Sequence, residues 1–336
     1  MAVTVVVGGQ YGDEGKGKII SYLALNDNPD VVARGGGGPN AGHSVEHEGK
    51  EYKIRLCPSG LVNEDAKLVI GAGVFIDADV FLKEVKDFSL GTRCKIDRRC
   101  TLITQEYKDL DGASANSSKI GTTKTGMGPT AAARASRTAK LVGTVEGLKP
   151  YLCDCHEIVN STDKVLIEGS QGFMLSNLYG TYPFCTSKDV SASAICSEVG
   201  IGPARVDTVV MVIKAYTTRV GNGPLEGEVS EEKAKKIGMQ EYGTVTGRAR
   251  RTNPNLIWKE IKYAAQVNGA NCLALTKLDV KFPKAAGVKE FEKLPKEAQD
   301  FILLVEKNSG VRVGLIGTGP DAGDVIDRRD ELGIKR

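Results

Sequence analysis

The sequence predicts an α/β fold in which a large mixed, mainly parallel sheet is flanked by helices. Short β-branched runs such as Val3–Val7 and Val165–Ile167 end in glycine-rich loops, which is typical of buried parallel strands. Helical patterns alternate with these runs, and this alternation favours parallel strands joined by crossover helices. The 336 residues allow about two domains or one large unit. Since no clear linker divides the chain, we expect one domain over residues 1–336 with small appended subdomains.

The elements follow one another in a regular order. After the first strand, Lys16–Leu25 has the pattern of a helix, and Ser44–Glu46 and Tyr52–Leu56 alternate around a turn as hairpins do. Residues 104–130 are polar and lack periodicity, so we expect a mobile substrate loop there. Helical patterns return over residues 130–159. The other predicted strands are Val31–Ala33, Leu68–Ile70, Val206–Tyr216, Leu273–Thr276 and Val311–Ile316, and the other predicted helices are Asp77–Phe88, 188–199, Pro254–Val267 and 293–307.

Composition and charge narrow the class of protein. Lysine and arginine number 45 against 42 acidic residues, and the net charge of +3 argues against a broad nucleic-acid or membrane surface. The apolar start is too short for a signal peptide, and no run approaches the ~20 residues that span a bilayer. Eight cysteines without a C-x-x-C spacing indicate free thiols in a reducing cytoplasm. Forty glycines, clustered between apolar runs, indicate backbone that approaches ligands closely.

A glycine loop with two lysines follows the first strand. Gly12 and Gly17-Lys18 have the spacing of GxxxxGK, the loop whose backbone N–H groups hold nucleotide phosphates at a helix N-terminus. Ile19 stands where that loop normally has the hydroxyl that ligates Mg²⁺. We therefore expect Asp13 to supply an oxygen ligand or to act as a general base. Taken alone, the segment is also compatible with a glycine turn that bears surface charges.

Further segments carry candidate site chemistry. His43 ends the densest glycine cluster and is placed to donate a proton near a nucleotide, although a histidine at a hairpin edge would look the same. Asp279 follows a strand, and its carboxylate can accept paired hydrogen bonds from guanine that adenine does not offer. Three arginines in Gly243–Arg251 form either a fork for an anionic substrate or a solvated basic turn. Gln171 also follows a strand and is expected to face the site.

Several stretches, in order and spread over essentially the whole chain, match one known pattern. They are GGQYGDEGKGK (8–18), PNAGHSV (39–45), IGTT (120–123), EGSQG (168–172), GTYPFCTSKD (180–189), KAYTTRVGNGP (214–224), EYGTVTGRARR (241–251), TKLDV (276–280) and GTGPD (317–321). Together they resemble the adenylosuccinate synthetase family, and the length is similar to that of its short archaeal-type members. The resemblance implies a fold related to P-loop nucleotide hydrolases.

The resemblance implies a GTP-dependent ligase that condenses IMP with L-aspartate to adenylosuccinate, GDP and phosphate, the first committed step from IMP to AMP. Phosphoryl transfer to O6 of IMP precedes attack of the aspartate amine on C6. By resemblance Asp13 is the base that takes the N1 proton, His43 is the acid, and Gln171 orients the O6 region. Asp13 and the backbone of Gly42 would ligate Mg²⁺. Arg137 would reach the neighbouring site of a cytoplasmic homodimer.

The resemblance also assigns residues to each substrate. GTP would contact Gly12, Asp13, Glu14, Gly15, Lys16, Gly17, Lys18, Gly42, His43, Ser44, Arg250, Lys277, Leu278, Asp279, Gly317, Thr318 and Gly319. IMP would contact Asp13, Asn40, Ala41, Gly42, His43, Thr123, Arg137, Gln171, Thr186 and Arg248. L-aspartate would contact Thr244, Val245, Thr246, Gly247, Arg248, Ala249 and Arg250.

Two alternatives stay open. Viral relatives of similar size build a succinyl adduct on dGMP, often with ATP, and have a smaller residue in place of the loop aspartate. Asp13 is retained here, which favours IMP. A non-enzymatic GTP-binding switch would explain the phosphate loop and Asp279, but it leaves Asn40–His43, Gln171 and Arg248 without roles.

Overall fold

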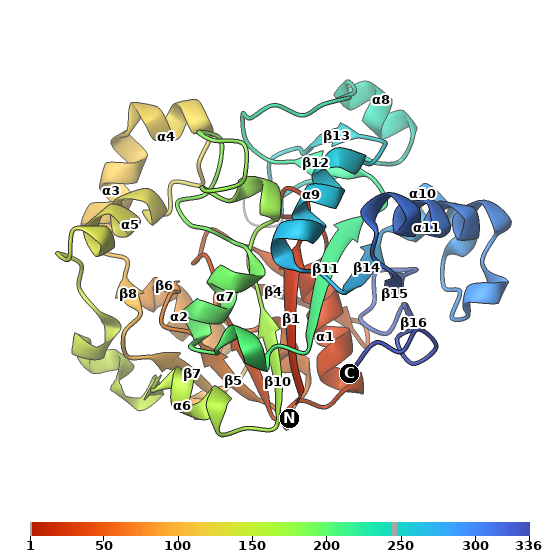
Figure 1. Ribbon diagram of the computed structural model, residues 1–336. Helices are drawn as coiled ribbons and strands as arrows, with labels where there is room; N and C mark the ends of the chain where they lie inside the picture. Colours follow the sequence, from red (N-terminus) through yellow and green to blue (C-terminus); the bar gives the residue numbers. More distant parts are fainter. Residues whose placement is uncertain (1, 244–246) are drawn as a thin grey trace.

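The computed structural model describes residues 2–243 and 247–336, and its centre is a ten-stranded sheet (Figure 1). Neighbouring strands of this sheet pair in parallel, except for the two strands nearest the C-terminus of the chain, which pair antiparallel. The predicted mixed, mainly parallel α/β fold is confirmed. In spatial order the strands are β16 (Val325–Asp327), β15 (Val313–Gly317), β14 (Cys272–Thr276), β11 (Thr208–Lys214), β1 (Ala2–Gly8), β10 (Lys164–Glu168), β2 (Val31–Arg34), β5 (Lys67–Ile70), β7 (Cys94–Asp97) and β9 (Leu152–Cys153).

The side chains of the central strand divide the core into two layers, because successive strand residues point to opposite faces. Val3, Val5 and Val7 of β1 pack in one layer, whereas Val6 packs in the other. Helices cover both faces of the sheet (Figure 1). The first layer includes residues of α6 (Cys155–Asn160), α7 (Ala192–Val199), α9 (Trp258–Asn268) and α11 (Lys296–Ser309), and the second includes residues of α1 (Lys16–Asn26) and α2 (Ala78–Asp87).

Small elements are appended to this sheet, and several of them carry site residues. The predicted hairpin forms, with His43 at its start. A second antiparallel ribbon pairs residues 217–219 with residues 251–253 and so closes the segment that contains the arginine loop. These elements are the hairpin β3 (His43–His47) and β4 (Lys50–Ile54), the ribbon β12 (Thr217–Arg219) and β13 (Arg251–Asn253), the short pair β6 (Phe75–Ile76) and β8 (Thr101–Leu102), and the helices α8 (Glu231–Lys236) and α10 (Leu278–Lys281).

Residues 104–130 are not the aperiodic loop that the sequence predicts. Thr104 Oγ1 accepts a hydrogen bond from Tyr107 N at 3.4 Å, and Ser114 Oγ accepts one from Ser117 N at 3.2 Å. These caps begin short helices that depend on capping and tertiary contacts rather than on an apolar stripe. That this segment moves when substrate binds stays a prediction. The helices are α3 (Gln105–Ala113), α4 (Ala115–Ile120) and α5 (Met127–Ala135).

The helical pattern predicted over residues 130–159 is largely wrong. After α5 the chain makes two 3₁₀ turns, at Val142–Thr144 and Glu146–Tyr151, before β9 and α6. Pro150 lies within the second turn, and a proline cannot continue an α-helix. Glycine, which also weakens helices, occurs at position 143 in the first turn.

Other predicted elements differ from the structure mainly at their ends. The helix predicted from Pro254 begins only at Trp258, because the chain leaves β13 at Asn253 and bends over residues 254–255 before the helix starts. The short strands that lie outside the predicted ones are β6, β7, β8, β9, β12, β13 and β16. Within residues 2–243 and 247–336, no helix has the length and apolar character that crossing a membrane requires.

Candidate functional site

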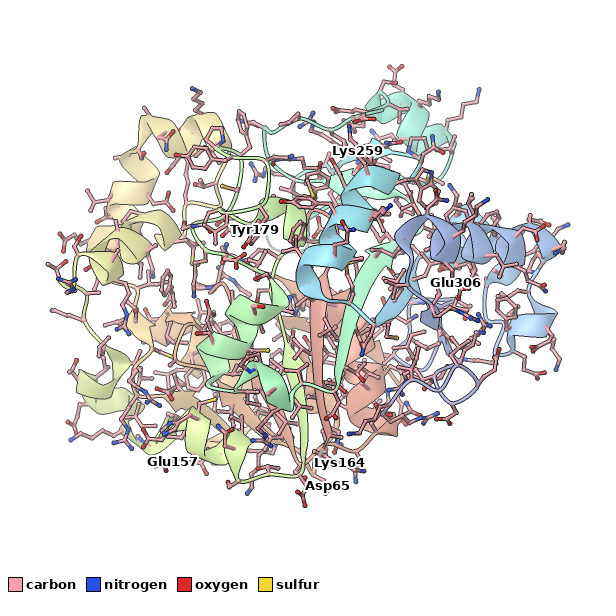
Figure 2. The ribbon with its side chains drawn as sticks, viewed as in Figure 1. Asp65, Glu157, Lys164, Tyr179, Lys259 and Glu306 are labelled. Carbon is pink, nitrogen blue, oxygen red and sulfur yellow. The ribbon has the colours of Figure 1, made fainter. Side chains whose placement is uncertain are left out.

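The candidate site residues gather at the edge of the sheet where the parallel strands end. Strands β1, β2, β10, β11, β14 and β15 run in one direction, and each leads into a segment that the sequence analysis singled out. Ligands of open α/β sheets bind at this edge. At the opposite edge, charged residues such as Asp65 and Lys164 extend into solvent (Figure 2).

A cavity of about 450 Å³ opens at this carboxyl edge. Its volume lies within the usual range for sites that enclose a small organic ligand. Asp111 and Arg219 also line it, although the sequence analysis did not single them out. The predicted site residues in its lining are Gly12, Asp13, Asn40, Ala41, Gly42, His43, Thr123, Gln171, Thr186 and Arg248.

The first glycine loop folds around a buried ion pair. Glu14 Oε1 accepts hydrogen bonds from the backbone N–H groups of Gln10 (3.0 Å) and Gly12 (2.9 Å). Its Oε2 lies 2.8 Å from Lys16 Nζ, and both side chains are only 1% exposed. Gly172 leaves room for this carboxylate, since a Cβ there would collide with it. Glu14 and Lys16 therefore shape the loop from within.

Lys18 joins the first loop to the segment that follows β15. Its Nζ donates to the carbonyl oxygens of Asp324 (2.9 Å) and Gly319. Burial lowers the pKa of Lys18 to about 8. The predicted phosphate loop and the predicted GTP residues Gly317–Gly319 are thereby held together.

The residues predicted to read guanine lie beside the cavity rather than in its lining. Lys277 is exposed, with a left-handed backbone (φ 59°), and precedes the short helix α10. Asp279 is half-buried in that helix, whereas the side chain of Leu278 is fully buried in the core. Leu278 can therefore offer only its backbone to a nucleotide. Ser44, also predicted for GTP, is exposed on β3.

His43 turns its ring toward the end of β10. Its Nδ1 lies 3.0 Å from Ser59 Oγ and contacts Glu168 Oε1. Gly17 permits this approach, since a Cβ there would lie 3.1 Å from the Cβ of His43. Burial lowers the pKa of His43, although the Glu168 carboxylate acts in the opposite direction. With Nδ1 occupied by Glu168, Nε2 is the ring nitrogen left for the cavity, and it can donate there only when the ring is protonated at both nitrogens.

Gln171 presents an unpaired acceptor. It follows β10 with a left-handed backbone (φ 57°), and its Nε2 donates to Asn40 Oδ1 at 3.3 Å. Its Oε1 is buried and has no hydrogen-bond partner among the described residues. A buried polar atom without a partner costs about 1–3 kcal/mol. A ligand N–H or O–H group would remove that cost.

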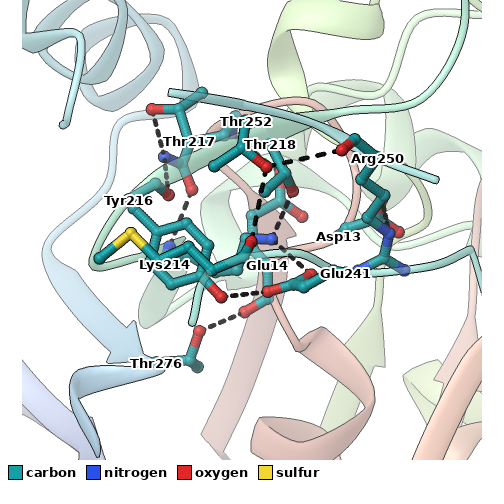
Figure 3. A network of polar contacts seen from close by, with 12 residues as sticks. Asp13, Glu14, Lys214, Tyr216, Thr217, Thr218, Glu241, Arg250, Thr252 and Thr276 are labelled. Carbon is teal, nitrogen blue, oxygen red and sulfur yellow. Dashed lines mark hydrogen bonds and ion pairs between the residues drawn. The ribbon is translucent and has the colours of Figure 1, made fainter. Parts of the chain in front are cut away.

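Charged side chains connect Asp13 to the arginine loop (Figure 3). Arg250 Nε lies 2.8 Å from Asp13 Oδ2, an ion pair without an aligned hydrogen bond. Arg250 also contacts Glu241, which accepts from Lys214 Nζ (2.9 Å) and from Tyr216 Oη. Burial raises the pKa of Asp13, and Arg250 opposes this. Burial would also raise the pKa of Glu241, but Lys214 and Arg250 hold it at about 2.

The loop predicted to hold L-aspartate is described in part. Residues 244–246 (Thr244, Val245 and Thr246) lie outside the described residues. Arg248 lines the cavity, and its Nη2 donates to the carbonyl oxygen of Gly121 at 3.0 Å. Gly247 and Ala249 are exposed beside it. Arg137, predicted for IMP, is exposed and lies outside the lining of the cavity.

The sequence analysis missed the polar residues that hold the candidate catalytic groups in place. Glu168 and Lys214 are the last residues of the apolar strands β10 and β11. An ionisable residue at the end of a buried strand is the signal that could have identified both. Ser59, Glu241 and Asp111 have no comparable local signal, because none of them ends a buried strand.

Comparisons with known proteins agree on one family. The chain matches the family model described as adenylosuccinate synthetase over residues 5–146 and 138–283. It is 51% identical to the adenylosuccinate synthetase of Thermococcus sibiricus, covering 98% of this chain and 99% of the relative. It is 48% identical to that of Archaeoglobus fulgidus, again covering 98% of this chain and 99% of the relative.

Two solved structures share the fold. A fully ligated adenylosuccinate synthetase from Plasmodium falciparum superposes with a TM-score of 0.91 at 26% identity, covering 97% of this chain and 100% of that one. The succinoaminodeoxyadenylate synthetase of cyanophage S-2L, bound to dGMP and dATP, superposes with a TM-score of 0.82 at 25% identity. That match covers 99% of this chain and 98% of the phage chain.

Proposed function

The chain belongs to the adenylosuccinate synthetase family and is a GTP-dependent ligase that joins IMP to L-aspartate, and we propose that Asp13, His43 and Gln171 carry its chemistry. One observation carries this assignment of roles: the three side chains come from separate strand ends and line the same cavity. Convergence of polar groups from several strand ends is typical of enzyme sites in α/β folds. A GTP-binding switch would leave this cavity without a role.

In the first half of the reaction, Asp13 takes the N1 proton of IMP while O6 attacks the γ-phosphorus of GTP. The bond from O6 to phosphorus forms as the bond to the departing GDP oxygen breaks. Burial raises the pKa of Asp13, which makes its carboxylate a better general base. His43, protonated at both ring nitrogens, donates from Nε2 to the phosphoryl group in transit and stabilises its charge. Gln171 orients the O6 region of the purine, because its Nε2 has a second N–H besides the one that Asn40 Oδ1 accepts and can donate it to O6.

In the second half, the amine of L-aspartate attacks C6 of the phosphorylated purine and inorganic phosphate leaves. Arg248 lies at the cavity and offers a guanidinium fork, which binds carboxylates with two parallel hydrogen bonds. We assign the carboxylates of L-aspartate to Arg248 and Thr246. Arg248 also contacts the carbonyl oxygen of Gly121, so the aspartate loop and the loop that carries Thr123 meet at this point.

IMP and GTP occupy neighbouring parts of the carboxyl edge in this proposal. IMP lies in the cavity, against Asn40, Ala41, Thr123 and Thr186. GTP lies beside it, with its phosphates at the first glycine loop and its base at α10. The contact of Lys18 with Gly319 supports this second position, since it joins two of the predicted GTP segments.

The residues present fit a Mg²⁺ site. Asp13 and Gly42 both line the cavity and offer a carboxylate and a backbone carbonyl, which are the hard oxygen ligands that Mg²⁺ prefers. Such sites often use only one or two protein ligands together with phosphate oxygens and water. Among the described residues there is no cluster of three His, Cys, Asp or Glu side chains suited to a metal. When bound, Mg²⁺ supplies charge that offsets the phosphates of GTP.

We extend the proposal to the assembly and its compartment. Arg137 is exposed and does not line the cavity of its own chain, so it is free to serve a neighbouring one in a homodimer. All eight cysteines are free thiols, which suits the reducing cytoplasm.

Product analysis by mass spectrometry tests the function. The purified protein is incubated with Mg²⁺, L-aspartate, GTP and either IMP or dGMP. We expect a succinyl adduct of IMP alone, and we expect Asp13→Asn to reduce its rate by about 10²- to 10⁴-fold, because the base is lost. An adduct of dGMP would contradict the role of Asp13 in excluding that substrate. Bound GTP with no adduct would restore the switch interpretation.

A further inference from the structure

We propose that Glu168 is a positioning residue for His43: its carboxylate holds Nδ1 of the imidazole so that Nε2 faces the phosphoryl group in transit. This inference rests on the proposed function, in which His43 meets that group. The inference extends the proposed function because it names the group that sets the orientation of the His43 ring.

Both oxygens of the Glu168 carboxylate have fixed partners. Oε1 contacts His43 Nδ1 and accepts a hydrogen bond from Ser59 Oγ at 2.7 Å. Oε2 accepts from the backbone N–H of Ser59 at 2.6 Å. Glu168 and His43 are 0% and 7% exposed at their side chains. The carboxylate therefore cannot turn without breaking several hydrogen bonds, and the ring it contacts is fixed with it.

Burial would raise the pKa of Glu168, but His43 and then the neighbouring cation Arg34 lower it. Arg34 lies opposite Glu168 in the register of β2 and β10 and is fully buried. Its guanidinium donates to Ser170 Oγ (3.2 Å) and to the carbonyl oxygen of Cys57 (3.3 Å). Arg34 is thus held beside Glu168 by other groups and supplies charge without occupying the carboxylate oxygens. Those oxygens remain available to His43 and Ser59.

Glu84 shows what a buried glutamate does when its role is only structural. It is 5% exposed, and its carboxylate accepts from the backbone N–H groups of Leu56 (3.0 Å) and Cys57 (2.9 Å), with a further contact from Arg55 N. These donors belong to the backbone of residues 55–57, which lie outside the lining of the cavity. Glu168, in contrast, uses one oxygen on a side chain that lines the cavity. Glu84→Gln is therefore the matched control for Glu168→Gln.

Steady-state kinetics with IMP, L-aspartate and GTP test the proposal. We expect Glu168→Gln to lower kcat by about 100-fold, because a displacement of about 1 Å at a reacting group has effects of that size. The KM values for IMP and GTP should stay within about threefold, since neither substrate touches Glu168. Glu84→Gln should lower the melting temperature at least as much and leave kcat near the wild-type value.

A double-mutant cycle separates positioning from general stability. If Glu168 acts through His43, Glu168→Gln should cause no further loss of kcat in a His43→Asn background. If the double variant instead loses kcat by the product of the two single-variant factors, the proposal is wrong. If Glu168→Gln does not fold, Ser59→Ala replaces it in the same cycle, because Ser59 Oγ contacts both partners. A wild type that forms no product would refute the proposed function, whereas an active wild type with an equally active Glu168→Gln would refute only this inference.

Discussion

Environment gives the acidic residues of the site different tasks. The Asp13 side chain is 21% exposed and faces a cavity, and its ion pair with Arg250 lacks an aligned hydrogen bond. The Asp13 carboxylate can therefore give up its contact with Arg250 and accept a proton from a substrate. Glu168 is fully buried and hydrogen-bonded at both oxygens, so it can orient a neighbour but cannot reach a substrate. The proposed base and the proposed positioning residue are therefore distinguished by access rather than by residue type.

Asp279 provides a test at the scale of one residue. We expect Asp279→Asn to reduce the preference for GTP over ITP by about 10- to 100-fold, because charge-assisted hydrogen bonds to guanine contribute about 1.5–3 kcal/mol. The measurement is the ratio of kcat/KM for the two nucleotides. Asp300→Asn is the control, since Asp300 lies exposed on α11, where it pairs with Lys296 one helical turn away. An unchanged ratio in Asp279→Asn would remove Asp279 from guanine recognition.

At the scale of elements, the central strands were more predictable than the helices α3–α5. Strands such as β1 and β10 are apolar, largely β-branched runs that lead into glycine-rich loops, so both their existence and the position of the following loop could be predicted. That is why Asp13, His43 and Gln171 could be selected before the structure was known. The helices α3–α5 gave no such signal, because they are short; α3 and α4 begin at polar caps, and α5 begins after Gly126.

Asp111 organises the segment that these helices form. It is 3% exposed on α3 and accepts from Ser117 Oγ (2.6 Å), Thr122 Oγ1 (3.2 Å) and Gly126 N (2.9 Å). These partners lie before, within and after the turn that carries Thr123. One carboxylate thus sets the shape of the loop that we assign to IMP.

We expect Asp111→Ala to raise the KM for IMP by about 10-fold or more, because several hydrogen bonds to a buried charged group are lost together. The KM for GTP should change little, since the predicted GTP segments lie elsewhere on the edge. Asp109→Ala, on the exposed side of the same helix, serves as the control. An unchanged affinity for IMP, measured by calorimetry on folded Asp111→Ala, would show that the loop keeps its shape without this residue.

At the scale of the molecule, the order of strands in the sheet decides which predicted residues meet. Strand β10 lies between β1 and β2, so the loops with Asp13, His43 and Gln171 become neighbours. The sequence predicts that parallel strand ends share an edge, but it does not predict their order. His43 and Glu168 are separated by 125 positions, and no local pattern links them. The polar network that supports the site therefore became visible only in the folded chain.

A mixed dimer tests the assignment of Arg137 to a neighbouring site. Asp13→Ala and Arg137→Leu protomers should each be nearly inactive alone. When they are co-expressed in equal amounts, a mixed dimer keeps one site with both residues, so random pairing should restore roughly a quarter of wild-type activity. Co-expressed Asp13→Ala and His43→Asn should restore nothing, because both lesions affect the site of the same chain. Full activity of Arg137→Leu alone, or a mixture that stays inactive although size-exclusion chromatography with two tags shows mixed dimers, would contradict a shared site.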